Sequence, residues 1–588
     1  MLYIQGIINT VMKILTVFFN DYKKETILAP LFKLLEALMD LIVPLIIANI
    51  INDGVLNNDK NIIIKYFFYL IGLAVLGLLF SFTAQWFAAK ASVGFSCDLR
   101  KALFDKAESL SYKQLDNIST DTLITRMTSD VNQIQNGLNL SLRLLLRSPF
   151  IVFGSMIMAF TIDVKLALIF LISIPILSIV VFGIMYITIP LYEKSQKKLD
   201  ELLSAARENL NGVRVLRAFR KEDDEINNFN SLNNSLTSNN IYVGKYSSLM
   251  NPLTYVTVNI AIVVLIYQGA LKVELGILRQ GDVLALYNYM AQIIIELIKL
   301  ASLVITINKS LACADRVEEI LEIDPDMKYQ ESIQNNNGNK VIEFKDVCFS
   351  YNDETVETLS DINFDLDKNK TLGIIGGTGS GKSSLGQLIL RNYDVNKGDV
   401  LIDGENVKNY SRKDLINKIG IVEQKDVLFE GTIRENMKLG NDNASDEEIY
   451  EALRIAQALE VVENKENGLD SLVEQNGRNF SGGQRQRLCI ARALVKKPEI
   501  LILDDSSSAL DLITDKNLRT EINKIENMSV VIISQRTSSI MNADKILVLN
   551  DGKLVGVGIH EDLLDKCDVY KEIYYSQHPD EAKGNLYE

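Results

Sequence analysis

Six long apolar segments in the first half of the sequence limit its possible folds more than any other feature. They cover residues 27–51, 66–89, 138–161, 166–189, 249–271 and 283–307. A helix of about 20 residues, rising about 1.5 Å per residue, crosses a hydrocarbon layer about 30 Å thick. Buried helices of a soluble protein are the alternative, but six such runs favour membrane spans. An even number of spans places both ends of this region on the same side of the membrane.

Two long connections between the spans, residues 90–137 and 190–248, carry most of the positive charge of this half. Basic connections face the cytoplasm. Their helix-rich composition predicts that spans two to five continue as helices beyond the bilayer, by about 40 Å. The chain must reverse near residues 112–117 and 216–221, which are the candidate contact points for another domain. Arg143 and Arg147 are expected to reach the cytoplasmic interface.

Several charged residues fall inside the apolar segments. Glu36 and Asp40 lie one helical turn apart in the first, and Glu296 precedes Lys299 by three residues in the sixth. Charges within a membrane are costly and often functional, so Glu36, Asp40 and Glu296 are candidates for a substrate cavity. The alternative is structural, because Glu296 and Lys299 have the spacing of a helical ion pair.

The N-terminal 26 residues show apolar side chains at helical spacing opposite polar ones, a pattern that predicts a helix along the membrane surface. The pattern lacks the basic start, continuous apolar core and cleavage site of a signal peptide. The net charge of −14 argues against a nucleic-acid partner. The five cysteines lie far apart, so neither disulfides nor a zinc site is expected.

A phosphate-binding loop marks the second half. A short apolar strand, residues 371–375, leads into the sequence GGTGSGKS at residues 376–383, which matches GxxxxGK[ST]. Glycines let backbone N–H groups surround phosphate oxygens, while Lys382 reaches the β- and γ-phosphates and the Ser383 hydroxyl binds Mg²⁺. The apolar run 499–503 ends in Asp504, which is the expected second magnesium ligand. The predicted ATP-binding residues of the loop are Gly376, Thr378, Gly379, Ser380, Gly381, Lys382, Ser383 and Ser384.

Between these motifs stands the sequence Ser481, Gly482, Gly483, Gln484. SGGQ is the signature of ABC ATPases, and the resemblance to that family continues from residue 341 to about residue 564. It implies that Tyr351 stacks on adenine. It also implies that Gln424 is a catalytic residue that contacts ATP, the metal and the helical extensions of the membrane domain. The segment before the signature and the N-terminal six-span region resemble a half-size ABC exporter.

The resemblance also implies a dimer, because each nucleotide in this family lies between the phosphate loop of one domain and the signature of the other. Residues Ser481 to Gln484 would then contact ATP on the partner, and Asp511 would lie at the dimer interface. ATP and Mg²⁺ are the implied cofactors.

The sequence departs from the family pattern at two catalytic positions. The family places a glutamate after the strand-ending aspartate, where this chain has Asp505, and a histidine after the next strand, where it has Gln535. The side chain of aspartate is one methylene shorter than that of glutamate, so its carboxylate stops about 1 Å or more short of the usual base position. Gln535 can hydrogen-bond phosphate but cannot carry the charge or the proton of an imidazole. This pair of changes beside an intact signature resembles the degenerate-site subunit of heterodimeric bacterial multidrug-type exporters. The implied partner is a second ABC half-transporter that keeps the glutamate and the histidine.

The sequence therefore predicts an all-α membrane domain of six helices with long cytoplasmic extensions, followed by an α/β P-loop ATPase domain. The expected boundaries are a surface helix at 1–26, a membrane domain at 27–324, a linker at 325–340, the ATPase domain at 341–575 and a polar tail at 576–588. The expected function is ATP-dependent export of small molecules, lipids or peptides across a bacterial plasma membrane, with the N-terminus and the ATPase domain in the cytoplasm. A slow homodimeric exporter and an ATP-gated regulator or channel are the alternatives.

Overall fold

The computed structural model describes residues 18, 20–330, 339–351, 357–507 and 509–579 of the chain. The chain divides into two compact units, Met1–Glu108 with Thr120–Ile323, and Ser109–Ser119 with Asp324–Glu588. Most of the surface helix predicted for residues 1–26 lies outside the described residues.

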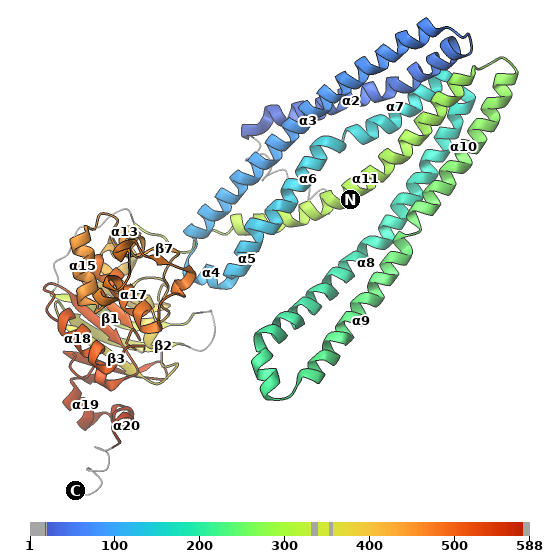
Figure 1. Cartoon of the computed structure of the whole chain (residues 1–588). Coiled ribbons are helices and arrows are strands. Elements are labelled where there is room, and N and C mark those ends of the chain that lie inside the picture. Colours follow the sequence, from blue (N-terminus) through green and yellow to red (C-terminus); the bar gives the residue numbers. More distant parts are fainter. Residues whose placement is uncertain (1–17, 19, 331–338, 352–356, 508, 580–588) are drawn as a thin grey trace. The chain divides into compact units, whose positions relative to one another are not determined.

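The described residues of the first unit form helices and the turns that join them (Figure 1). Its elements are η1 (Asn20–Tyr22), α2 (Lys23–Asn49), η2 (Ile50–Val55), α3 (Lys60–Ser109), α5 (Thr120–Thr125), η3 (Arg126–Asp130), α6 (Val131–Leu144), α7 (Arg147–Ile162), α8 (Val164–Ala218), α9 (Glu222–Ser247), α10 (Met250–Glu274) and α11 (Gln280–Leu321).

In the described part of the chain, six helical segments are long and apolar enough to cross a membrane: Lys23–Val55, Lys60–Ser109, Thr120–Ile162, Val164–Ala218, Glu222–Glu274 and Gln280–Leu321. Helix α8 has 55 residues, which at about 1.5 Å per residue is far longer than the bilayer core. The predicted cytoplasmic extensions are therefore confirmed.

The extended helices α8 and α9 form a hairpin whose end lies apart from α6 and α11 (Figure 1). Beyond the membrane-length part of α8 and at the start of α9, large apolar side chains are exposed to solvent, namely Leu203, Leu210, Val215, Phe219 and Ile226. Several exposed apolar side chains on one arm are typical of a surface that another chain covers.

An ion-pair network joins three helices in the membrane unit. Arg147 Nη1 lies 2.7 Å from Glu296 Oε1 on α11, and Arg147 Nη2 lies 2.9 Å from Asp40 Oδ2 on α2. Ser148 Oγ donates to the second oxygen of Glu296 at 2.8 Å, and Lys299 pairs with Glu296 at 2.9 Å. The predicted pairing of Glu296 with Lys299 is confirmed.

The prediction that Arg147 reaches the cytoplasmic interface is wrong, because its side chain is only 11% exposed. The carboxylates that hold it inward come from α2 and α11, which are far from α7 in sequence. Asp40 keeps 44% of its side chain exposed, whereas Glu296 keeps 5%.

The substitution Arg147→Met is expected to lower the free energy of unfolding by about 2 to 3 kcal/mol, because it removes one of the two cations paired with the buried carboxylate of Glu296 and leaves Asp40 without its ion-pair partner. Thermal unfolding of the detergent-solubilised chain measures this loss. The matched control is Arg279→Gln, since the pair between Arg279 and Asp53 is 64% and 38% exposed and is expected to contribute less than about 1 kcal/mol. Equal unfolding temperatures for both variants would contradict a stabilising role for Arg147.

The second unit contains two large sheets, a two-stranded sheet formed by β7 and β8, and the helices around them (Figure 1). Its strands are β1 (Lys340–Phe349), β2 (Leu359–Asp367), β3 (Thr371–Gly376), β4 (Lys397–Ile402), β5 (Glu405–Asn406), β6 (Ile419–Val422), β7 (Gly431–Thr432), β8 (Leu472–Val473), β9 (Ile500–Asp504), β10 (Ser529–Ile533), β11 (Lys545–Asn550) and β12 (Lys553–Gly558). Its helices are α4 (Tyr112–Ile118), α12 (Lys382–Ile389), η4 (Val407–Asn409), α13 (Arg412–Lys418), α14 (Ile433–Lys438), α15 (Asp446–Ile455), α16 (Leu459–Glu463), η5 (Gly468–Asp470), η6 (Gln475–Gly477), α17 (Gly482–Val495), α18 (Leu512–Ile522), η7 (Thr537–Ser539), α19 (His560–Lys566) and α20 (Asp568–Gln577).

The larger sheet has the strand order β12-β11-β3-β10-β9-β6, and all neighbouring pairs are parallel except β11 with β12. The smaller sheet, β2-β1-β4-β5, is antiparallel. The central strands are buried along their length, as expected for a parallel sheet covered on both faces. Parallel strands end at one edge, so the loops after β3, β9 and β10 lie together there.

Helix α4 packs with the ATPase unit although its sequence lies between membrane helices. The Tyr393 hydroxyl donates to Asp116 Oδ2 at 2.5 Å, and Gln114 Nε2 donates to the carbonyl oxygen of Asp324 at 2.8 Å. The ring of Tyr112 lies 6.3 Å from that of Tyr393. The hydrogen bond and the ring contact with Tyr393 confirm that the first reversal of the chain contacts the ATPase domain.

Candidate nucleotide-binding site

The phosphate loop joins β3 to α12, and two of its glycines have backbone angles that other residues avoid. Gly379 has φ +81° and Gly381 has φ +92°. At Gly381 a Cβ atom would also lie 2.6 Å from Leu359 Cδ2. The loop therefore requires glycine at this position for both conformation and space.

Lys382 folds back onto the loop in the described structure. Its Nζ donates to the carbonyl oxygens of Gly376 at 2.9 Å and Gly377 at 2.6 Å. Burial lowers the pKa of Lys382, while the carboxylates of Asp504 and Asp505 act in the opposite direction. Ser380 Oγ is buried and has no hydrogen-bond partner among the described residues. The loop thus holds polar groups that a phosphate could engage.

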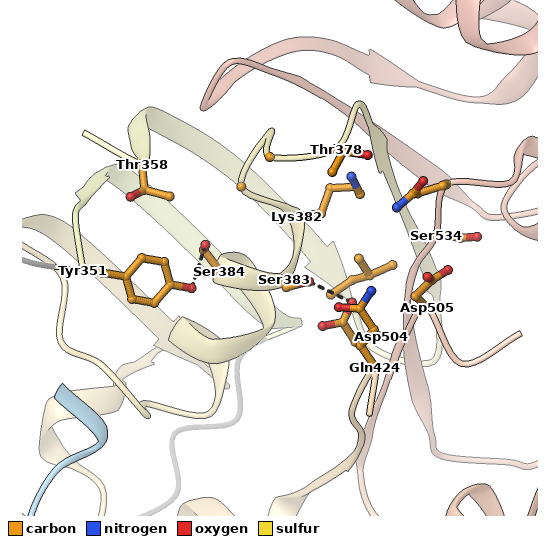
Figure 2. Close-up of a pocket in the computed structure, with 14 residues that line it drawn as sticks. Tyr351, Thr358, Thr378, Lys382, Ser383, Ser384, Gln424, Asp504, Asp505 and Ser534 are labelled. Carbon is orange, nitrogen blue, oxygen red and sulfur yellow. Dashed lines mark hydrogen bonds between the residues drawn. The ribbon is translucent and has the colours of Figure 1, made fainter. Parts of the chain in front are cut away.

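Three oxygen-bearing side chains meet at the inner end of the loop (Figure 2). Ser383 Oγ donates to Asp504 Oδ1 at 3.1 Å, and Gln424 lines the same cavity. Burial raises the pKa of Asp504; the bond from Ser383 lowers it and the neighbouring Asp505 raises it further. A cation at this point would stabilise the ionised carboxylate. Hard oxygen ligands of this kind fit Mg²⁺, which commonly takes one or two carboxylates and completes its shell with substrate phosphate and water. No group of three or more His, Cys, Asp and Glu side chains that could hold a metal occurs among the described residues.

Asp505 and Gln535, the two residues that depart from the family pattern, line the cavity that also contains Ser383 and Asp504. The volume of this cavity is about 290 Å³. Asp504, the last residue of β9, pairs with Ile533, the last residue of β10. Asp505 and Ser534 therefore directly follow the ends of two neighbouring strands. Burial raises the pKa of Asp505, against the opposing effects of Arg536 and Lys382. Gln535 follows Ser534 and also lines the cavity.

Tyr351 lies at the end of the cavity away from Asp505, next to Thr358 (Figure 2). Its hydroxyl forms a 2.9 Å hydrogen bond with Ser384 Oγ, and its ring lies edge-on to Tyr393 at 5.0 Å. Burial raises the pKa of the Tyr351 hydroxyl. Thr358 was not predicted, because it stands before β2 and belongs to no recognisable motif.

The substitution Tyr351→Ala is expected to weaken ATP binding by about 1 to 2 kcal/mol, a factor of about 5 to 30, because base stacking on the ring is lost. Calorimetric titration of the purified chain with Mg·ATP measures the change. Tyr351→Phe is the control, since it keeps the ring and removes only the bond to Ser384. A phenylalanine variant as weak as the alanine variant would argue for the hydroxyl rather than for stacking.

The SGGQ residues begin α17. Ser481 Oγ accepts from the Gln484 backbone N–H at 3.3 Å, and Gln484 Oε1 accepts from the Ser481 N–H at 2.9 Å, which forms a capping box. The N–H groups of Gly482 and Gly483 therefore belong to a helix N-terminus, where anions bind. None of the described residues that line the Tyr351–Gln535 cavity belongs to this motif.

Asp511 caps the next helix, α18. One of its carboxylate oxygens accepts from the backbone N–H groups of Ile513 at 3.1 Å and Thr514 at 2.9 Å. The predicted interface position of Asp511 stays a prediction.

Comparison with known proteins agrees with this architecture. Residues 26–297 match the family described as ABC transporter transmembrane region, and residues 359–508 match the family described as ABC transporter. The uncharacterized ABC transporter ATP-binding protein YfiB of Bacillus subtilis (strain 168) is 36% identical over 560 residues, which cover 95% of this chain and 97% of that protein. The chain belongs to the ABC transporter family.

Two further similarities concern the exporter branch of ABC transporters. The ATP-dependent lipid A-core flippase of Yersinia pestis bv. Antiqua (strain Antiqua) is 28% identical over 560 residues, covering 94% of this chain and 95% of that protein. The solved structure of a bacterial Atm1-family ABC exporter with ATP bound superposes with a TM-score of 0.79 at 23% identity, covering 94% of this chain and 98% of the other, and shows the same fold.

This ABC transporter chain is a half-transporter, with one membrane domain and one ATPase domain. It is a multi-pass plasma membrane protein with a cytoplasmic ATPase domain, and the predicted fold class is confirmed. An ABC ATPase domain implies ATP binding, and ABC exporters act as dimers.

Proposed function

We propose that this chain is the ATP-holding half of an asymmetric exporter. Its phosphate loop retains ATP at a slow site, and its SGGQ signature completes a hydrolysing site on a second, different half-transporter. The single observation that carries the proposal is the composition of one cavity. Lys382, Ser383 and Asp504 are present there as in an active ATPase, while Asp505 and Gln535 occupy the two positions expected to act on the attacking water.

The roles of the residues follow from their chemistry. Lys382 and the N–H groups of residues 377–383 bind the phosphates, and Tyr351 stacks on the base. Ser383, Asp504 and Gln424 hold Mg²⁺, which when bound neutralises charge on the β- and γ-phosphates. The Asp505 carboxylate, one methylene shorter than glutamate, stops about 1 Å or more short of the position that the usual base takes. A well-positioned general base contributes a factor of about 10² to 10⁴ in rate. Gln535 can donate a hydrogen bond to phosphate but cannot accept and return a proton.

A partner chain is supported by the apolar side chains along the α8–α9 arm and by the position of the signature. The arm exposes Leu210 and Phe219, which a second chain would cover. Asp511, which caps the helix after the signature helix, would contact the partner's ATPase domain. We also propose the boundaries 1–26, 27–324, 325–340, 341–575 and 576–588 for the surface helix, membrane domain, linker, ATPase domain and tail.

The proposed cargo is a small molecule, a lipid or a peptide. The Yersinia relative is a lipid A-core flippase, which supports the lipid class. Glu36, Asp40 and Glu296 are the candidate residues of the substrate cavity. Of these three, we propose that Asp40 contacts the transported substrate. The other two carboxylates are shielded, with 15% and 5% of their side chains exposed.

Purification of the tagged chain from its native membrane tests the proposal. We expect a second ABC half-transporter to accompany it, the pair to hydrolyse ATP, and vesicles containing the pair to accumulate cargo. The chain purified alone should hydrolyse ATP at least about 100-fold more slowly than the pair. Comparable hydrolysis by the chain alone would favour a homodimeric exporter. ATP turnover by the pair without transport would favour a regulator or channel.

A further inference from the structure

The C-terminal helix α20 ends against the segment that carries Gln535. The side chain of Gln577, the last residue of α20, makes three hydrogen bonds to this segment. Its Nε2 donates to the carbonyl oxygen of Gln535 at 2.7 Å. Its Oε1 accepts from the backbone N–H of Thr537 at 2.9 Å and from Thr537 Oγ1 at 3.0 Å. One amide group therefore holds the backbone on both sides of residue 536.

The segment is held on its other side by the central sheet. The backbone N–H of Ser534 donates to the carbonyl oxygen of Ile374 on β3 at 3.0 Å. Thr537 is fully buried, with 0% of its surface exposed, so its two donors need an acceptor inside the protein. Gln535 thus lies between one anchor on β3 and a second anchor on Gln577.

Helix α20 is itself fixed to the element that begins the phosphate loop. Tyr570 is fully buried and packs in one apolar cluster with Ile375, the residue before Gly376. The Tyr570 hydroxyl also lies 2.7 Å from His560 Nδ1 on α19. The position of Gln577 is therefore set relative to the loop that binds the phosphates.

We propose that Gln577 is a positioning residue for Gln535. By fixing the backbone of residues 535–537, it keeps the Gln535 side chain on the cavity wall, from which that side chain can hydrogen-bond the γ-phosphate. The C-terminal helix thereby prolongs the time that ATP stays on this chain. The inference rests on the proposed function in one respect, namely that Gln535 contacts the bound nucleotide.

A double-mutant cycle on the full-length purified chain tests this proposal. The measured quantity is the rate at which a fluorescent, non-hydrolysable ATP analogue dissociates in the presence of Mg²⁺. Gln577→Ala is expected to raise this rate by a factor of about 3 to 10, the range that corresponds to one lost hydrogen bond. In the Gln535→Ala background, the same substitution is expected to leave the rate unchanged, because residue 577 acts through residue 535.

A conservative variant separates positioning from a purely structural role. Gln577→Glu keeps an acceptor for the two donors of Thr537 but cannot donate to the Gln535 carbonyl. We expect Gln577→Glu to unfold at a higher temperature than Gln577→Ala, because the donors of Thr537 keep their acceptor. It should nevertheless release the analogue at least as quickly as Gln577→Ala, because a carboxylate oxygen repels the Gln535 carbonyl oxygen. Ser576→Ala is the matched control, because Ser576 bonds only within its own helix in the described structure, to the Ile573 carbonyl.

Equal effects of Gln577→Ala with and without Gln535 would overturn the proposal, as would unchanged dissociation in the Gln577→Ala chain. Neither result bears on which chain hydrolyses ATP, because the analogue is not hydrolysed. Conversely, rapid ATP hydrolysis by the purified chain alone would refute the asymmetric exporter. The double-mutant cycle would still test whether Gln577 acts through Gln535, because it measures only dissociation of the analogue.

Discussion

The double substitution Asp505→Glu with Gln535→His is expected to raise ATP hydrolysis by the purified chain about 100-fold or more. The added methylene extends the carboxylate by about 1 Å toward the water, and histidine supplies a group that can exchange a proton near neutral pH. The cavity of about 290 Å³ that both residues line gives room for the longer carboxylate and for the imidazole ring. Steady-state release of phosphate from the chain in lipid vesicles measures the gain.

The interpretation depends on three control chains. Each single substitution is expected to give less than the double one, because a positioned base and a proton-exchanging residue act on the same water. Adding Lys382→Ala to the double variant should abolish the gained activity, since phosphate binding is lost. A double variant no faster than the unmodified chain would show that the slow step lies elsewhere, and would remove the main support for a degenerate site.

The sequence predicted those parts of the site that depend on short, local patterns. The phosphate loop needs glycine at fixed positions, and both Gly379 and Gly381 have positive φ. Ser383 and Asp504 were expected to bind the same Mg²⁺, because one follows the phosphate loop and the other ends an apolar strand, and the structure brings Ser383 Oγ within 3.1 Å of Asp504 Oδ1. The six spans followed from length and hydrophobicity alone.

Contacts between distant segments could not be predicted in this way. Arg147 was expected at the cytoplasmic interface, because nothing near it in sequence shows that Asp40 and Glu296 face it from other helices. The bonds from Gln577 to the segment after β10 join residues about 40 positions apart. No motif marks Gln577, since its role depends on where α20 packs.

The contacts of helix α4 with the ATPase domain could not be predicted from the sequence either. Composition assigned residues 112–117 to a membrane-domain connection, and the reversal of the chain there was predicted. The hydrogen bond between Asp116 and Tyr393 depends on a tyrosine that follows α12, nearly 280 residues later. Tyr393 also touches Tyr351, so the predicted adenine-stacking residue and the first cytoplasmic reversal share a neighbour.

The substitution Gly482→Asp is expected to reduce ATP hydrolysis by the complex of this chain with its partner at least 100-fold. The new carboxylate would lie at the N-terminus of α17, where the proposal places the γ-phosphate of ATP bound to the partner. Loss of a preorganised anion-binding group costs a factor of about 10² to 10³, and repulsion between like charges adds to it. Folding should be preserved, because the nearest atom to a Cβ at this position is Ala509 Cβ at 3.8 Å. An aspartate in the first turn of a helix is also favourable.

A comparison of two substitutions in the same complex separates an asymmetric transporter from a symmetric one. If hydrolysis occurs at the partner's phosphate loop, Asp505→Asn on this chain should change the rate less than about twofold, while Gly482→Asp nearly abolishes it. If both sites hydrolyse ATP, Asp505→Asn should remove a large share of the rate. Gly482→Asn, which has the shape of aspartate without its charge, is the matched control and should retain more activity than Gly482→Asp. Because Asp505 and Gly482 lie in the same domain but would act on different nucleotides, unequal effects of this kind assign the hydrolysed ATP to the second chain.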